Sequence, residues 1–223
     1  MAGDPVLIAA SHGTHSPAGR AAVDELRRAL AASRPGLEIV EAYVDEQVQR
    51  PGLSEVLDGK RPAVVVPVLL SAGYHVRHDI ARVASGVPSA RVARPLGPDQ
   101  VLVDVLADRL AGSAECDVVL AAAGSSDRRA GTDVRWTAAR LGERLGRVVR
   151  AAFVTADVPR VDEAVQELAR QGRRVALASY VLAPGHFYGR LLDVPADIHT
   201  PPLLPDARIA DLVLRRYDEI TVE

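Results

Sequence analysis

The sequence predicts an α/β protein made of two homologous domains, each with a small parallel sheet packed between layers of helices. Short apolar runs alternate with helical patterns along the whole chain, which is typical of parallel sheets with right-handed crossovers. The alternation starts again near Gly112-Ser113, and four segments recur in order. Their offset lies between 107 residues (Asp99 to Asp206) and 112 residues (Gly73 to Gly185). We therefore expect domains at about 1–112 and 113–223.

The elements of the first half follow from apolar runs and cap residues. Val6 to Ala10 is an uninterrupted apolar run, as in a buried strand. Ser16-Pro17 then supplies an N-cap and a first-turn proline for a helix. The elements expected next are strands at 37–44, 63–70 and 91–93, and helices that begin near Pro51, pass through Ile80 and Val83, and span 101–110.

The second half repeats these segments closely enough to be aligned with the first. The aligned pairs are 118–126 with 6–15, 151–154 with 41–44, 181–186 with 69–74, and 202–206 with 95–99. The apolar spacing of the closing helix also recurs, because Ile209, Leu212 and Val213 repeat Leu102, Val105 and Leu106.

Composition narrows the class of protein. The chain of 223 residues is 48% hydrophobic and 25% charged, as globular proteins are, and its net charge of -2 argues against nucleic-acid binding. Cys116 is the sole cysteine, so neither a disulfide framework nor a thiolate metal site is expected. With no basic leader and no apolar run of membrane-spanning length, we expect a soluble cytoplasmic protein without a membrane partner.

Polar side chains follow the predicted strands of the first half where each strand ends. His12 follows the first strand, Asp45 and Glu46 the second, and His75 the third. The carboxyl ends of parallel strands meet at one edge of a sheet, where α/β proteins place their chemistry. A single histidine there would more often cap a turn than bind a metal. Two imidazoles and one carboxylate favour an open metal site in which the ion can exchange.

The alignment predicts that this site is one-sided. His12 aligns with Ala123, Asp45 with Thr155, and His75 with Phe187. The second half keeps the loop sequences Gly124-Ser125-Ser126 and Pro184-Gly185. We therefore expect it either to bind substrate or only to form one wall of the cleft.

The roles of several other polar residues are either left open or expected to be structural. His15 and His78 lie three residues beyond the stronger candidates, and Asp79 is either a partner that orients an imidazole or a first-turn carboxylate. His186 has no assigned role, and His199 is expected to be structural. There is no G-x-G-x-x-G or Walker pattern and no G-x-S-x-G elbow, which argues against nucleotide binding and hydrolase chemistry.

Taken together, these motifs resemble the sirohydrochlorin chelatase family, the CbiX and SirB class II chelatases, over essentially the whole chain. The resemblance is carried by Ser11-His12-Gly13-Thr14, Tyr43-Val44-Asp45, the loop 71–80 (Ser-Ala-Gly-Tyr-His-Val-Arg-His-Asp-Ile), Ala123 to Asp127, and Leu182 to Gly185. It implies a lyase-type metal chelatase in the long form with fused halves, acting as a monomer, with its active site in the cleft between the domains.

The resemblance also implies the substrates. The family inserts a divalent metal into sirohydrochlorin for sirohaem or cobalamin synthesis. We expect Fe²⁺, with Co²⁺ as the alternative, and no organic cofactor. His12 and His75 match the two metal-contacting, catalytic histidines, and Asp45 matches a position where many relatives have glutamate. A non-catalytic carrier of tetrapyrrole or metal is the rival hypothesis, and a sugar- or nucleotide-binding module is disfavoured because the phosphate loop is missing.

The tetrapyrrole carries many carboxylates, which basic side chains and exposed backbone N–H groups can hold. Arg77 is the first candidate, with Arg20 and Arg128 behind it. The residues expected to bind this substrate are Ser11, Gly13, Ser71, Gly73, Tyr74, Arg77, Gly124 and Ser125.

Overall fold

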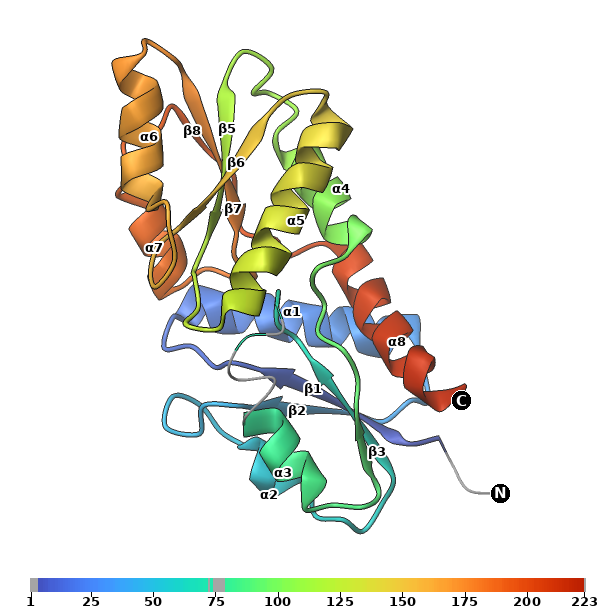
Figure 1. Ribbon diagram of the computed structural model, residues 1–223. Coiled ribbons are helices and arrows are strands. Elements are labelled where there is room, and N and C mark those ends of the chain that lie inside the picture. Colours follow the sequence, from blue (N-terminus) through green and yellow to red (C-terminus); the bar gives the residue numbers. More distant parts are fainter. Residues whose placement is uncertain (1–3, 72, 74–78, 223) are drawn as a thin grey trace. The chain divides into compact units, whose positions relative to one another are not determined.

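The computed structural model describes residues 4–71, 73 and 79–222. Within these residues the chain forms two four-stranded parallel sheets, with strand orders β2-β1-β3-β4 and β6-β5-β7-β8 (Figure 1). The identical order and the helices that flank both sheets confirm the predicted fold class, two α/β domains of the same three-layer type. None of the described helices is long and apolar enough to cross a membrane.

The first sheet contains β1 (Val6–Ser11), β2 (Ile39–Tyr43), β3 (Ala63–Pro67) and β4 (Ala90–Val92). The helices of the same repeat are α1 (Pro17–Ser33), α2 (Leu53–Val56), α3 (Ala81–Ser85) and α4 (Gln100–Arg109). The second sheet contains β5 (Asp117–Ala122), β6 (Val149–Phe153), β7 (Val175–Tyr180) and β8 (Ile198–His199). Its repeat has α5 (Arg128–Leu145), α6 (Val161–Arg170), α7 (His186–Leu192) and α8 (Ala207–Thr221).

The central strands are buried on both faces, which explains why they are apolar without alternation. On one face of the first sheet, Val6, Ile8 and Val65 pack with the side chains of α2 and α3 in one core. In the second sheet, Val119, Ala121 and their neighbours pack with α6 and α7. The remaining face of the first sheet lies against α1 and α8, and α4 and α5 pack together beside the second sheet.

The two compact units of the structure differ from the two sequence repeats in one helix each. Unit 1 contains residues 1–96 together with 206–223, and unit 2 contains 97–205. Helix α8, the last element of the second repeat, therefore packs in unit 1 against α1 and β3, while α4 of the first repeat packs in unit 2 against α5 and β7. The repeats exchange their closing helices.

Strand β3 ends at Pro67, three residues before the end that the apolar run predicts. Proline has no N–H to donate, so Pro67 removes one possible ladder bond at this end of the strand. The next residues remain tied to their neighbours, because Val68 donates its N–H to the carbonyl of Ala10 at 2.8 Å. The end of β3 is thus fixed although it is no longer regular strand.

Candidate metal site

The turn that carries His12 is joined to the end of the neighbouring strand by two backbone hydrogen bonds. The N–H of Val44 donates to the carbonyl of Ser11 at 2.9 Å, and the N–H of Asp45 donates to the carbonyl of His12 at 3.1 Å. Ser11 is buried and His12 is exposed. The structure therefore brings two of the predicted ligand residues, His12 and Asp45, to one edge of the sheet.

Side chains hold the rest of this turn. The N–H of Thr14 donates to Oε1 of Gln49 at 3.2 Å, and Nε of Arg20 donates to the carbonyl of Thr14 at 3.0 Å. Ser16 caps α1 by accepting from the N–H of Gly19 at 3.2 Å, as its position before Pro17 predicts. Arg20, a candidate for binding substrate, thus contributes to the shape of the turn.

The two candidate carboxylates at the end of β2 have different neighbours. Asp45 is half-buried, and its Oδ1 accepts the N–H of Gln47 at 3.1 Å, which orients the side chain within its own turn. Oε1 of Glu46 accepts a hydrogen bond from the hydroxyl of Ser54 at 2.6 Å, beside the start of α2. Asp45 is the carboxylate next to His12, and Glu46 serves the α2 turn.

The third predicted ligand falls outside the described residues. The structure places Ser71 and Gly73, both half-buried, beyond the end of β3. Tyr74, His75, Arg77 and His78 are not described, so their roles stay predictions. Within 4–71, 73 and 79–222, no three His, Cys, Asp or Glu side chains are grouped so as to hold a metal ion.

The equivalent edge of unit 2 has the same backbone arrangement with other side chains. The N–H of Val154 donates to the carbonyl of Ala122 at 2.9 Å, and the N–H of Thr155 donates to the carbonyl of Ala123 at 2.9 Å. The hydroxyl of Thr155 donates to the same carbonyl at 2.8 Å. These bonds support the sequence alignment, which places Ala123 opposite His12 and Thr155 opposite Asp45.

The remaining histidines divide into exposed and bonded ones. His15 is exposed, and so is His186, whose ring meets Phe187 edge-on at 5.4 Å between centroids. Nε2 of His199 lies 2.9 Å from the carbonyl of Val194, in agreement with its predicted structural role. Cys116 is a buried free thiol.

Sequence reasoning missed a titratable group close to the site. Glu41 lies in the middle of β2, and its Oε1 is buried without a hydrogen-bond partner among the described residues. With Ser11 and Arg27 it lines a cavity of about 10 Å³. Burial raises the pKa of Glu41 although Arg27 acts to lower it. A glutamate in an otherwise apolar strand was the available signal.

An α/β domain with an imidazole and a carboxylate at adjacent strand ends belongs to the class of open α/β proteins, which bind their ligands at the carboxyl ends of the strands. The CbiX family model matches residues 6–113 and 117–220, one match for each repeat. The chain therefore belongs to the CbiX family, and the predicted membership of the sirohydrochlorin chelatase family is confirmed.

Solved structures with the same fold agree with this assignment. SirB from Bacillus subtilis with Fe³⁺ is 24% identical, with a TM-score of 0.79 over 98% of this chain and 96% of that chain. The sirohydrochlorin chelatase SirB from Bacillus subtilis subspecies spizizenii, in complex with cobalt, is 20% identical, with a TM-score of 0.80 over 99% and 96%.

A multi-domain protein from Deinococcus radiodurans with structural similarity to chelatases is 22% identical, with a TM-score of 0.68 over 97% of this chain and 55% of that chain. Among curated protein sequences, none matches this chain significantly.

Proposed function

We propose that this protein inserts a divalent metal ion into sirohydrochlorin, with His12 and His75 as ligands of the incoming ion. Besides membership of the CbiX family, one observation carries the proposal. Unit 1 places His12 beside Asp45 at the edge of its sheet, and unit 2 has Ala123 and Thr155 on the same backbone. A one-sided site of this kind suits a reaction in which one ion meets one face of a macrocycle.

The proposed ligand set is weak enough to release its ion. Two imidazoles and the Asp45 carboxylate leave coordination positions open, whereas structural sites close all four. The ion is a substrate in this reaction, so tight binding would slow its transfer to the macrocycle. The exposed side chain of His12 also lets the ion arrive directly from solvent.

Metal insertion releases two pyrrole N–H protons for each ion that enters. A neutral imidazole is a base with a pKa near neutrality, so a histidine that has given up its ion is suited to accept one of these protons. From His12, which is exposed, the proton passes to water.

Substrate carboxylates need hydrogen-bond donors and positive charge near the sheet edge. Helix α5 begins with Arg128 and Arg129 at its positive end, where the helix dipole disfavours cations. Both side chains are exposed, and the capped loop at Ser125 precedes them. Such an arrangement supports a role in binding an anion. In addition to these arginines, we propose that the substrate contacts Ser11, Gly13, Ser71, Gly73, Tyr74, Arg77, Gly124 and Ser125.

Fe²⁺ is the metal we propose, with Co²⁺ as the alternative. Imidazole accepts both ions, and supply in the cell overrides the intrinsic order of affinity. The solved SirB relatives contain Fe³⁺ in one case and cobalt in the other. Parallel anaerobic assays with Fe²⁺ and Co²⁺ as competing substrates test the preference, and faster insertion of Co²⁺ would reverse it.

The decisive experiment follows the absorbance of sirohydrochlorin during metal insertion, against the spontaneous reaction. Both His12→Ala and His75→Ala should lower the rate by roughly a hundredfold or more, because each removes a ligand and a base. His15→Ala, which changes an exposed neighbour, is the matched control and should keep the rate. Near-normal rates in both site variants contradict the proposal. Stoichiometric binding without any rate enhancement identifies a carrier instead.

A further inference from the structure

Helix α5 carries the sole tryptophan of the chain on its exposed side. Trp136 has 38% exposure, whereas Val134, Thr137 and Ala138 beside it are buried. The buried side of the helix packs against α4 and β6 (Figure 1). One exposed aromatic residue is normal on a protein surface, so the neighbours of Trp136 decide whether it binds a ligand.

The indole ring of Trp136 has a cation beside it. Cζ of Arg140, one helical turn further on, lies 5.5 Å from the centroid of the ring, which is the distance of a cation–π contact. Arg140 also donates to Oε2 of Glu143 at 2.7 Å. A guanidinium has several N–H donors, so this bond leaves others for an anion. An aromatic face and cationic donors thus lie next to one another on the surface of α5.

The charge of α5 is opposite in sign to that of the chain as a whole. The helix contains five arginines and two acidic residues, a net charge of +3, while the whole chain has a net charge of -2. Helix α1, which follows the first strand of the first repeat as α5 follows that of the second, has no aromatic residue. The exposed side of α5 therefore favours an anionic ligand with an apolar face.

Two exposed arginines lie before and after Trp136 on the same side of the helix. Arg129 is seven positions before it and Arg140 is four positions after it, spacings that return to one helix face. At a rise of about 1.5 Å per residue, these two arginines start about 10 Å before and about 6 Å after the tryptophan. Thr132 and Ala139, exposed between them, are small. A flat ligand on the indole ring can therefore reach a cation at each end.

A tetrapyrrole with carboxylates around its rim matches this arrangement. Its conjugated ring offers a large face for stacking on tryptophan, and its carboxylates point in opposite directions, toward both arginines. A nucleotide also stacks on aromatic side chains, but its phosphates lie on one side of the base and would leave one of the two arginines without a partner. The substrate of the proposed function has the required shape and charge.

We propose that Trp136, Arg129 and Arg140 form a docking surface for a polycarboxylate tetrapyrrole on α5, in addition to the substrate contacts at the sheet edges. The macrocycle stacks on Trp136, and its carboxylates pair with the two guanidinium groups. The identity of the ligand rests on the proposed function, whereas the surface rests on α5 alone.

Binding at this surface has a specific reporter, because the chain contains a single indole N–H. The ¹⁵N-labelled full-length chain is titrated with uroporphyrin, a metal-free tetrapyrrole with carboxylates on every pyrrole ring. The indole cross-peak of Trp136 should move upfield and saturate, because the ring current of a stacked macrocycle shields the indole proton. A cross-peak that does not move, or one that polyglutamate moves equally, overturns the proposal.

Two charge variants have effects of opposite expected sign on uroporphyrin binding, followed at the indole cross-peak. Arg140→Gln should weaken binding by about threefold, because it removes a partner of a carboxylate. Glu143→Gln should strengthen binding by about threefold, because it removes a negative charge and releases Arg140. Arg150→Gln removes an exposed arginine paired with Glu167, outside α5, and is the matched control that should leave the affinity unchanged. An unchanged or weaker affinity in Glu143→Gln, or an equal loss in the control, overturns the proposal.

The same titration separates this inference from the proposed function. If the chain inserts no metal into sirohydrochlorin but shows the saturable shift of Trp136, the proposed function fails and the docking surface is supported. If the chain inserts metal while uroporphyrin and sirohydrochlorin both leave the Trp136 cross-peak in place, the proposed function stands and the docking surface is overturned.

Discussion

The two sheet edges of this protein share a backbone and differ in chemistry. At each edge, the residue after the first strand of the sheet accepts the N–H of a residue after the second, which is Asp45 to His12 in unit 1 and Thr155 to Ala123 in unit 2. The side chains at these places are an imidazole and a carboxylate in one unit, a methyl and a hydroxyl in the other. The two repeats thus share the backbone of these turns, and the proposed metal chemistry depends on the side chains at the two positions.

The hydroxyl of Thr155 makes a hydrogen bond in the unit 2 turn at the position where unit 1 has a carboxylate. It donates to the carbonyl of Ala123 at 2.8 Å, so it adds a bond inside the turn that Asp45 does not make. Asp45 instead accepts from Gln47, within the chain that follows it. The unit 2 turn is closed on itself, which is a structural use of the position.

The largest expected difference between the two turns is the loss of stability when the glycine of each turn is replaced by alanine. Gly13 and Gly124 both have positive φ, +100° and +89°. A Cβ on Gly124 would lie 1.9 Å from the carbonyl oxygen of Thr155, whereas a Cβ on Gly13 would meet Val48 at 3.4 Å. Gly124→Ala should lower the free energy of unfolding by about 4 kcal/mol through overlap and strain, and Gly13→Ala by about 1.5 kcal/mol through strain alone.

Urea unfolding of both variants, followed by far-ultraviolet circular dichroism, measures this difference. Similar losses in the two variants would mean that the unit 2 turn relaxes easily and that the two turns are equally tight. In that case the closed turn of unit 2 would not be a structural replacement for the carboxylate.

The second prediction concerns the carboxylate itself. Asp45→Ala should weaken Co²⁺ binding by roughly tenfold, because it removes an acidic neighbour of His12. Thr155→Ala should leave Co²⁺ binding unchanged and lower the free energy of unfolding by about 1 kcal/mol, since it removes one hydrogen bond. Titration with Co²⁺ and thermal melting of both variants check this contrast. Unchanged affinity in Asp45→Ala would leave the histidines as the whole site.

The fold and the adjacency of His12 and Asp45 followed from the sequence for a physical reason. Buried parallel strands are continuous apolar runs, and each ends where its polar residues begin, so the residue pattern alone identifies His12 and Asp45 as neighbours. The repeat supports the predicted neighbourhood a second time, because two aligned turns are expected to have the same backbone geometry.

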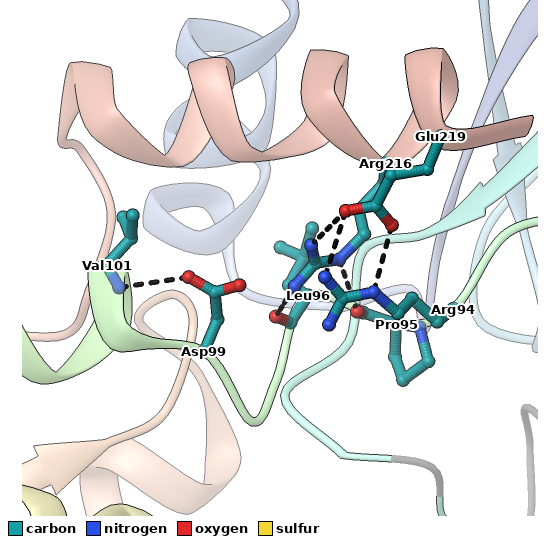
Figure 2. A network of polar contacts seen from close by, with 7 residues as sticks. All are labelled: Arg94, Pro95, Leu96, Asp99, Val101, Arg216 and Glu219. Carbon is teal, nitrogen blue, oxygen red and sulfur yellow. Dashed lines mark hydrogen bonds and ion pairs between the residues drawn. The ribbon is translucent and has the colours of Figure 1, made fainter. Parts of the chain in front are cut away.

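The helix exchange was not predictable in this way. Apolar spacing shows that α8 has a face to bury and does not show which sheet buries it. Arg216 stands beside Arg215 in the sequence, where it is indistinguishable from a surface arginine, yet it is fully buried. Its hydrogen-bond partners, the carbonyls of Pro95 and Leu96, are backbone groups more than a hundred positions away and carry no signal in the side-chain pattern (Figure 2).

The smallest predicted difference in stability comes from a residue inside the second strand of each sheet. Glu41 of β2 aligns with Ala151 of β6, so unit 1 alone has a carboxyl group at this place in the strand. The cavity that it lines with Ser11 and Arg27, about 10 Å³, has room for at most one water molecule. Burial raises the pKa of Glu41, so the folded protein favours the neutral acid more than the unfolded chain does.

The contribution of Glu41 to the free energy of unfolding should therefore be largest where Glu41 is protonated in both states, below its unfolded pKa of about 4.3. It falls as pH rises through the raised folded pKa and stays lower above it. Glu41→Gln should raise the free energy of unfolding at pH 7 by about 1 kcal/mol, because a neutral amide is less costly to bury than a carboxylate. Urea unfolding of the variant and the wild type at pH 4 and pH 7 measures the effect, which should nearly vanish at pH 4. A lower stability of Glu41→Gln at pH 7 would mean that the ionised carboxylate has a favourable partner in unit 1, and that this half of the chain needs its charge as well as its imidazoles.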